Sequence, residues 1–350
     1  MPELREVFET VRNQTEPVLG AWKEQERRQR RVVRNRKIGA ISLSAALALV
    51  AAWFALLGSD ATDQGKETNK VIGQPATLPS EPGVYLFDLE TQQATRVAGI
   101  DPVSSGIAVS PDGTMIAYGG FDPGGQHVIY VASIDGTNIR ALEKTAATAP
   151  DTVVMGFSPD GSQIVYQSRV DGYTVGDLFL VDVATGETTQ LTNLEPVSSS
   201  FWWDMAPSFS PDGQTVLFTR ANSHKINRSW DLWSVPATGG RPRLVLRDAV
   251  LGRFSPDGRT IAYFKPTPAD PLGDMWLADA DGKDARRLAR GDLLAPRWSP
   301  DGTKIAYDDR GRGGTYVVDV TTGGTSRVLD GAYWPEWIDE QTWIVAPDPF

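Results

Sequence analysis

Two patterns of apolar positions divide this chain. Residues 38–57 form one apolar run without a charged side chain, whereas the residues beyond 83 show short segments in which apolar and polar positions alternate. As a helix, the apolar run is about 30 Å long, which is the thickness of the hydrocarbon layer of a membrane. Alternation with a period of two predicts strands that bury one face. The sequence therefore predicts one transmembrane helix followed by an all-β domain.

The charges beside the apolar run give the predicted helix an orientation. Arg and Lys crowd residues 27–37, whereas the residues directly after the run carry two Asp and no base. The positive-inside rule then places the amino terminus in the cytoplasm and the β domain outside it. A cleaved signal peptide and a buried core helix are alternatives, but a signal peptide has a shorter charged start and a shorter apolar stretch.

This orientation predicts three segments before the β domain. Residues 1–37 are expected to form a basic cytoplasmic segment with short helical stretches, residues 38–57 the membrane anchor, and residues 58–82 a polar, flexible linker. The basic segment could simply contact anionic headgroups, or it could dock a cytoplasmic regulator. Small residues recur every four positions in the anchor and would allow two helices to dimerise, unless they only reflect an alanine-rich span. They are Ala40, Ser44, Ala48 and Ala52.

A repeated tetrapeptide, Ser-Pro-Asp-Gly, is the strongest signal in the β region. It begins at Ser110, Ser158, Ser210, Ser255 and Ser299. Intervals of 44 to 52 residues are typical of propeller blades and solenoids. Pro sets φ at the second position of a type I turn, Asp suits the third, and Gly accepts the left-handed conformation that follows. Each tetrapeptide therefore predicts the corner of a hairpin, with a short alternating strand after it.

A second half-repeat, strand-turn-strand, occurs six times and begins at Val84, Val128, Asp177, Asp231, Asp274 and Thr315. The first copy lacks its own tetrapeptide hairpin. Residues 334–345 match the missing hairpin but have lost the tetrapeptide. The two ends therefore complete one blade, which would leave no open sheet edge. The sequence predicts a six-bladed β-propeller of four-stranded antiparallel blades over residues 83–350.

The Ser-Pro-Asp-Gly hairpin, followed by Ile-Ala-Tyr and then by a strand such as Tyr316-Val-Val-Asp, resembles the TolB-type propeller repeat. The resemblance implies a propeller fold but says little about activity. Similar repeats occur in periplasmic scaffold proteins, in the propeller lids of prolyl-oligopeptidase-like enzymes and in some polysaccharide lyases. The resemblance also has a limit. TolB resembles a soluble periplasmic protein that carries an additional amino-terminal α/β domain, whereas in this chain the predicted membrane anchor stands in the place of that domain. Binding of Pal is therefore not implied.

Composition and charge narrow the classes of partner. The formal net charge of -10 divides into +4 for residues 1–37 and -14 for the rest of the chain. An acidic propeller repels phosphate backbones, so nucleic acid is not an expected partner. The chain contains no Cys, which excludes disulfides, thiolate metal ligands and a thiol nucleophile.

The sequence offers few groups for catalysis. No α/β-hydrolase segment with a Gly-x-Ser-x-Gly nucleophile motif follows the repeats, and His127 and His224 are the only histidines. A multi-histidine metal site is therefore not expected. The acidic segment 279–284 could suggest calcium, but it falls where every other repeat has a turn. We expect no cofactor, no metal and no catalytic residue, although a glycan-active hydrolase or lyase remains an alternative.

Two insertions around the third tetrapeptide hairpin are the best candidates for binding. Segments 198–204 and 220–230 should meet on one rim, where aromatic and basic side chains suit a peptide, a glycan or an acidic partner. The candidate residues are Phe201, Trp202, Trp203, Asp204, Arg220, His224, Lys225, Arg228 and Trp230. Alternatively, Trp202 or Trp203 plugs the channel or packs between blades. Core positions are predicted for Trp233, Trp276, Trp298 and Trp337.

Together these patterns predict a membrane-anchored, extracytoplasmic propeller that binds a protein or an envelope polymer without catalysis. One alternative is a transmembrane sensor whose cytoplasmic segment contacts a regulator, in the manner of an anti-sigma factor. The other is a glycan-active enzyme.

Overall fold

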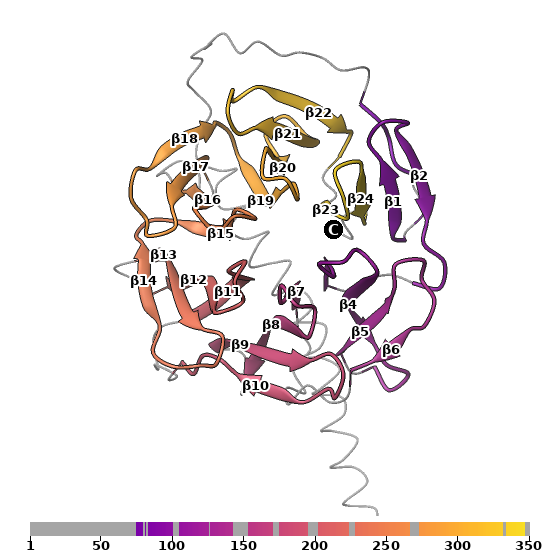
Figure 1. The fold of residues 1–350 in the computed structure, drawn as a ribbon, viewed down its shortest axis with the longest axis horizontal. Helices are drawn as coiled ribbons and strands as arrows, with labels where there is room; N and C mark the ends of the chain where they lie inside the picture. The colour runs from indigo at the N-terminus through magenta and orange to yellow at the C-terminus, as the bar shows by residue number, and fades with distance from the viewer. Residues whose placement is uncertain are drawn as a thin grey trace, which may run out of the picture. The chain divides into compact units, whose positions relative to one another are not determined.

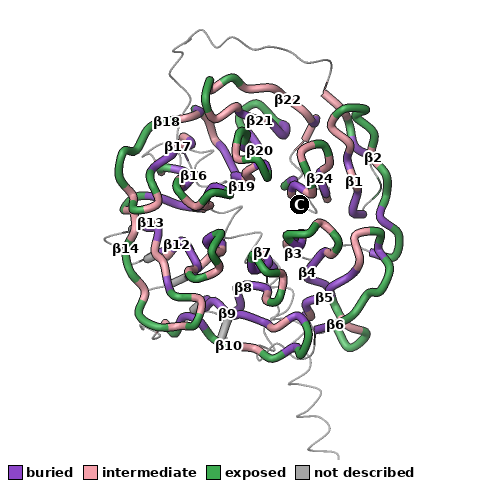
Figure 2. Tube along the Cα trace, viewed as in Figure 1, coloured by how far each residue is buried: buried purple, intermediate pink, exposed green. Residues whose placement is uncertain are grey.

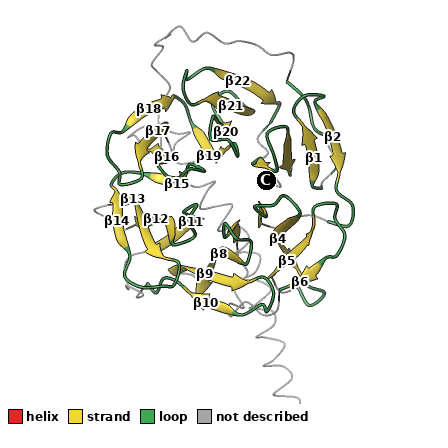
Figure 3. Ribbon diagram, in the orientation of Figure 1, coloured by secondary structure: helices red, strands yellow, loops and turns green. Residues whose placement is uncertain are grey.

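The computed structural model describes residues 75–79, 81, 83–100, 105–125, 127–142, 153–170, 175–194, 202–223, 228–266, 273–331 and 334–346. All lie in the second of two units of the chain, Ser59–Phe350. They form twenty-four strands and no helix (Figure 3). Among them, no helical segment could cross a bilayer. The predicted basic segment 1–37 and anchor 38–57, with its dimerisation stripe, lie outside the described residues.

The strands are arranged as six four-stranded antiparallel blades around a ring (Figure 1). Blade 1 contains β3 (Ser105–Val109), β4 (Met115–Phe121), β5 (His127–Ser133) and β6 (Arg140–Ala141). Blade 2 contains β7 (Val153–Phe157), β8 (Gln163–Val170), β9 (Val175–Asp182) and β10 (Thr188–Gln190). Blade 3 contains β11 (Trp202–Phe209), β12 (Thr215–Ser223), β13 (Arg228–Pro236) and β14 (Arg243–Leu246).

The remaining strands build the other half of the ring. Blade 4 contains β15 (Val250–Phe254), β16 (Thr260–Lys265), β17 (Asp274–Asp279) and β18 (Arg286–Ala289). Blade 5 contains β19 (Leu293–Trp298), β20 (Lys304–Asp309), β21 (Thr315–Asp319) and β22 (Thr325–Leu329). The closing blade contains β1 (Tyr85–Asp88), β2 (Gln93–Arg96), β23 (Glu336–Trp337) and β24 (Thr342–Val345). The predicted six-bladed, all-β fold is confirmed.

The closing blade joins the two ends of the propeller. Its strand order is β2-β1-β24-β23, so the amino-terminal part supplies the two outer strands and the carboxy-terminal part the two inner ones. Tyr85 pairs with Val345, and Phe87 pairs with Trp343. The side chains of Phe87 and Trp343 are completely buried, with ring centroids 6.3 Å apart. The predicted closure is thus held by backbone pairing and by an apolar core of its own.

The chain just before β1 also packs on the ring. Ala76 forms a parallel bridge with Leu329 of β22, and its N–H donates to the carbonyl of Val328 at 3.0 Å. Leu78 is buried among the core residues of the closing blade. Residues 75–79 are therefore part of the propeller, although the sequence predicts a flexible linker over 58–82. The difference arises because a single apolar side chain and one bridge give no periodic signal.

The Ser-Pro-Asp-Gly turns have the same geometry in all five copies. Each Ser hydroxyl donates to the Asp carboxylate two residues later at 2.5 to 2.6 Å. The same oxygen accepts the N–H five residues after the Ser at 2.9 to 3.0 Å. The Gly adopts φ between 70° and 72°, a left-handed conformation that favours glycine. The hydroxyl of Ser255 also holds the pKa of Asp257 below its usual value.

Successive turns touch one another around the ring. A methyl group on the Gly of one turn would lie 3.5 to 3.9 Å from Pro Cδ of the preceding turn. In the closing blade, whose turn lacks the tetrapeptide, Ile338 takes the place of Pro and faces Gly113. Glu340 of that blade accepts the N–H of Asp301 at 2.7 Å. The tetrapeptides therefore shape each hairpin and also pack neighbouring blades against each other.

Buried side chains lie mainly along the strands, whereas most turns are exposed (Figure 2). Trp337 is buried as predicted, whereas three predicted core tryptophans are only partly buried and pack against core clusters. They are Trp233, Trp276 and Trp298. The indole N–H of Trp298 donates to the carbonyl of Arg253 in the preceding blade, and that of Trp337 to Arg297. These two indoles link the inner strands of neighbouring blades.

The closing blade provides a test of the fold. We expect Trp343→Ala to lower the free energy of unfolding by about 3–5 kcal/mol, because it empties a fully buried site in the sheet that joins both ends. Trp334→Ala is the matched control, since that side chain is 43% exposed, and it should change stability by less than about 0.5 kcal/mol. Chemical denaturation measures both. Equal effects of the two substitutions would contradict the assigned closure.

Candidate functional site

Blade 3 carries three long strands side by side, which no other blade does among the described residues. Its strands β12 and β13 have nine residues each, and β11 has eight. The pairing runs to the very end of these strands: Trp203 pairs with Ala221, and Ala221 in turn with Trp230. We call the ends of these strands, 202–204, 220–223 and 228–230, the extended rim. The two insertions of the sequence thus meet side by side.

Six of the nine candidate binding residues lie on the extended rim. The structure places Trp202, Trp203 and Asp204 on β11, Arg220 at the outer part of β12, and Arg228 with Trp230 on β13. Trp230 is half-buried against the core cluster that contains Val250 and Phe264, so part of its surface supports blade 4. The remaining three candidates lie outside the described residues; they are Phe201, His224 and Lys225.

Asp204 and Arg220 form an ion pair. The guanidinium of Arg220 donates from Nε and from one terminal nitrogen to the two carboxylate oxygens of Asp204, both at 2.7 Å. Asp204 is completely buried, while the Arg220 side chain is 14% exposed. The same guanidinium lies 5.1 Å from the ring of Trp233 and 5.3 Å from that of Phe218. This bidentate pair fixes β11 against β12, and only Arg220 retains a surface that a ligand can reach.

A second buried carboxyl group, Asp177, faces this pair from blade 2. It accepts the N–H of Leu194 at 3.0 Å, the hydroxyl of Thr192 at 3.2 Å and the amide of Gln190 at 3.2 Å. Burial, together with the nearby charge of Asp204, raises the pKa of Asp177 to about 6. The site therefore holds two buried carboxyl groups and one guanidinium.

The cause of this proximity is an irregular link between blades. The outer end of β11 pairs in parallel with β9, matching Trp202 with Val175 and Trp203 with Gly176. The next residues along the two strands are Asp204 and Asp177. No other two blades share such backbone pairing among the described residues. The link joins blades 2 and 3 at the extended rim itself.

Sequence analysis did not select Asp177, and its local pattern explains why. Asp177 begins a half-repeat, as Asp231 and Asp274 do in the next two blades. Each accepts an N–H seventeen residues later, from Leu194, Asp248 and Gly291 respectively. This recurring bond fixes the connection to the next blade and is structural. Asp177 additionally faces the buried carboxyl group of Asp204, which is a tertiary feature.

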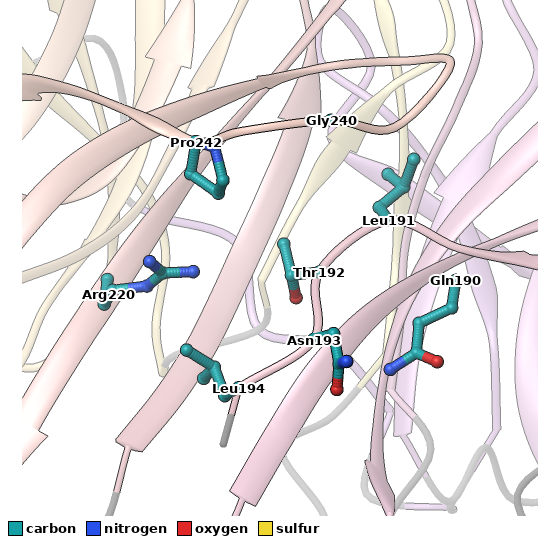
Figure 4. A pocket seen from close by; sticks show the side chains of 8 residues that line it. All are labelled: Gln190, Leu191, Thr192, Asn193, Leu194, Arg220, Gly240 and Pro242. Carbon is teal, nitrogen blue, oxygen red and sulfur yellow. The ribbon is translucent and has the colours of Figure 1, made fainter.

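A cavity of about 280 Å³ lies against these groups (Figure 4). Blade 2 contributes the segment 190–194, and blade 3 contributes Arg220 and the turn at Gly240 and Pro242. Its wall combines amide, hydroxyl and guanidinium groups with leucine and proline side chains. A cavity of this size is at the small end of ligand sites. The arrangement can accept one polar group, such as an amide or a sugar hydroxyl, from a ligand on the rim.

The histidine and the acidic segment that were considered for metal binding take part in the packing and the turns of the fold. Within the described ranges, no three His, Asp or Glu side chains come together as metal ligands do. His127 begins β5, where burial lowers its pKa to about 4, and Phe121 packs against it edge-on. The acidic segment 279–284 forms the expected hairpin turn, in which the N–H of Asp279 donates to the carbonyl of Lys283 at 2.8 Å.

Comparisons with known proteins agree with this architecture. No protein-family model matches the sequence. The Tol-Pal system protein TolB of Alcanivorax borkumensis is 37% identical over 73 residues, which are 18% of this chain and 16% of that protein. The uncharacterized peptidase YuxL of Bacillus subtilis is 30% identical over 111 residues, 28% of this chain and 16% of that one. The chain therefore spans only about a sixth of these two relatives.

Solved structures match over much more of the chain. The putative TolB of Agrobacterium tumefaciens has a TM-score of 0.58 at 18% identity, covering 76% of this chain and 98% of that one. TolB of Acinetobacter baumannii has a TM-score of 0.56 at 18% identity, covering 73% and 66%. Likeness at this identity shows the fold.

The closed ring of six four-stranded blades defines the chain as a six-bladed β-propeller. More narrowly, its repeat makes it a propeller of the TolB type, as the Ser-Pro-Asp-Gly hairpins predict.

The buried carboxyl group of Asp177 makes a prediction about pH. Because its pKa in the folded state, about 6, exceeds the usual 3.8, the folded protein favours the protonated form. Stability should therefore fall as pH rises from about 4 to about 6 and stay lower above that range. Asp177→Asn should remove this fall, a change on the order of 2 kcal/mol between pH 4.5 and 7.5. Melting temperature across pH measures it.

Asp274→Asn is the matched control. Asp274 accepts the N–H of Gly291 in the equivalent position of blade 4, where its side chain is 24% exposed and forms an ion pair with Arg287. This substitution should leave the pH dependence of the wild type intact. If Asp177→Asn and Asp274→Asn behave alike, Asp177 does not titrate as assigned.

Proposed function

We propose that this protein is a non-catalytic binding module of the cell envelope that holds a protein partner on the extended rim of blade 3. The observation that carries the proposal is the rim itself. Three paired strands project there beyond the common blade length, and a buried bidentate ion pair holds them. A rigid edge that carries aromatic and basic residues loses little conformational entropy when it binds a partner.

The chemistry of the rim favours a protein over a small substrate. Tryptophan and arginine concentrate binding energy in protein interfaces, and three Trp and two Arg lie on neighbouring strand ends here. The cavity beneath is small, and no three His, Asp or Glu side chains come together as metal ligands do among the described residues. The likeness to TolB, a protein of the Tol-Pal system by its name, supports a role in the envelope.

Capture of a partner tests this proposal. The full-length protein, crosslinked in the cells that make it and purified, should recover a defined protein, and Trp203→Ala or Arg228→Ala should weaken that capture about 5- to 30-fold. Ile139→Ala is the matched control, because that side chain is 42% exposed on the far edge of blade 1. If both rim variants bind the partner as well as the wild type does, the extended rim is not the binding site. If only an envelope polymer is captured, the proposal of a protein partner is wrong.

We further propose that residues 38–57 anchor the propeller in the membrane with the propeller on the extracytoplasmic side. The apolar run and the basic residues that precede it support this proposal.

Cell fractionation tests the anchor. The full chain should sediment with membranes and resist extraction by high salt, and a chain without residues 1–57 should become soluble. Protease added to intact spheroplasts should digest the propeller of the full chain. A propeller that is protected until the membrane is lysed would reverse the proposed orientation.

A further inference from the structure

The innermost strands of the six blades share one equivalent position in their pairing with the second strand. It lies two residues before the Ser of each tetrapeptide, and its occupants are Ala108, Gly156, Ser208, Arg253, Arg297 and, in the closing blade, Glu336. Each pairs with the corresponding residue of the second strand in its blade, for example Arg253 with Ala262 and Arg297 with Ala306. These six positions are equivalent in register, and the inner strands that carry them surround the centre of the ring (Figure 1).

The charges in this layer are concentrated in half of the ring. Arg297 forms an ion pair with Glu336 of the next blade. Arg253 donates from a terminal nitrogen to the carbonyl of Pro207, in the preceding inner strand, at 3.0 Å. Within the described part of the chain, no carboxylate forms an ion pair with Arg253. The layer thus holds two guanidinium groups and one carboxylate, an excess of one positive charge.

Burial makes this excess charge unfavourable. Loss of water around Arg253, and then the like charge of Arg297, lower the pKa of Arg253 to about 9, while Glu336 opposes the shift. Arg253 as a whole residue nevertheless remains partly exposed. A charged group in such surroundings is stabilised when an opposite charge joins it.

The other half of the layer leaves room. Ala108, Gly156 and Ser208 carry no side chain larger than a hydroxymethyl group. Among the described residues, a Cβ added at Gly156 would have no atom within 4 Å, so no described side chain fills the space beside β7 at this level. The φ of Gly156 is not positive, and the position would accept a larger side chain without backbone strain. The small residues are therefore opposite the charged ones in the ring order.

We propose that Arg253, supported by Arg297, binds the carboxylate group of an anionic ligand at the axis of the propeller. A guanidinium matches a carboxylate with two parallel hydrogen bonds, which gives the pair both strength and direction. A carboxylate there would neutralise the excess charge, and the rest of the ligand would extend toward Gly156. This site is separate from the extended rim, and it does not depend on the function proposed for the rim.

A carboxylate can come from a peptide or from a sugar acid, and two probes distinguish these sources. N-acetylaspartate amide represents the peptide and galacturonate the sugar acid, with N-acetylasparagine amide as the uncharged analogue. Binding to the full-length protein is measured by calorimetry in buffer of low chloride content. We expect saturable binding of at least one carboxylate probe and none of the uncharged analogue. If the protein binds one carboxylate probe more tightly than the other, that probe indicates whether the carboxylate comes from a peptide or from a sugar acid.

Three variants test the residues. Arg253→Gln should weaken binding at least about 10-fold without lowering the melting temperature, because it removes a buried charge that lacks a carboxylate partner. Gly156→Leu should also weaken binding while both arginines remain. Arg290→Gln, at an exposed position, is the control and should bind as the wild type does.

Several outcomes would overturn the proposal. Absence of binding by the wild type would do so, as would equal binding by the wild type and Arg253→Gln. Asp348 lies outside the described residues, so a chain ending at Ala346 is also measured. If only that shortened chain binds the probes, the site serves the protein's own carboxylates and not an external ligand.

Discussion

The pairing of β1 with β24 is the contact on which the rest of the structure depends. Each of the other blades is a meander of neighbouring segments, but the closing blade combines strands that are about 250 residues apart in the sequence. Without that pairing, the inner strands of blades 1 and 5 would face water and both halves of the closing blade would expose an open edge. The buried pair of Phe87 and Trp343 provides the apolar area that stabilises this long-range contact.

A closed ring gives functional positions a rigid frame. The tetrapeptide turns pack Gly against Pro from blade to blade, so the corners of neighbouring hairpins keep a fixed spacing. The opposite ends of the hairpins are free to vary in length, and only blade 3 uses this freedom to extend three paired strands. The ion pair of Asp204 with Arg220, and the backbone link between β9 and β11, transfer the rigidity of the ring to that extension.

The two proposed sites use charge in different ways. On the rim, the charges of Asp204 and Arg220 are matched and mainly structural, and the pKa of the neighbouring Asp177 is raised because burial penalises a further negative charge. At the axis, Arg253 keeps a positive charge without a carboxylate partner among the described residues. The first arrangement holds strands together, whereas the second is suited to an external anion.

The sequence by itself determined the repeat, the number of blades and the closure, because turn chemistry and period-two alternation are local properties that recur at a readable interval. It also brought Trp203, Arg220 and Arg228 to one rim, since hairpin register follows from the same pattern. It could not reveal the roles of Asp177, Arg253 or residues 75–79. Those depend on which side chains from different blades face one another, and on how much water burial removes around them. Only the tertiary structure decides these distances, because no local pattern encodes them.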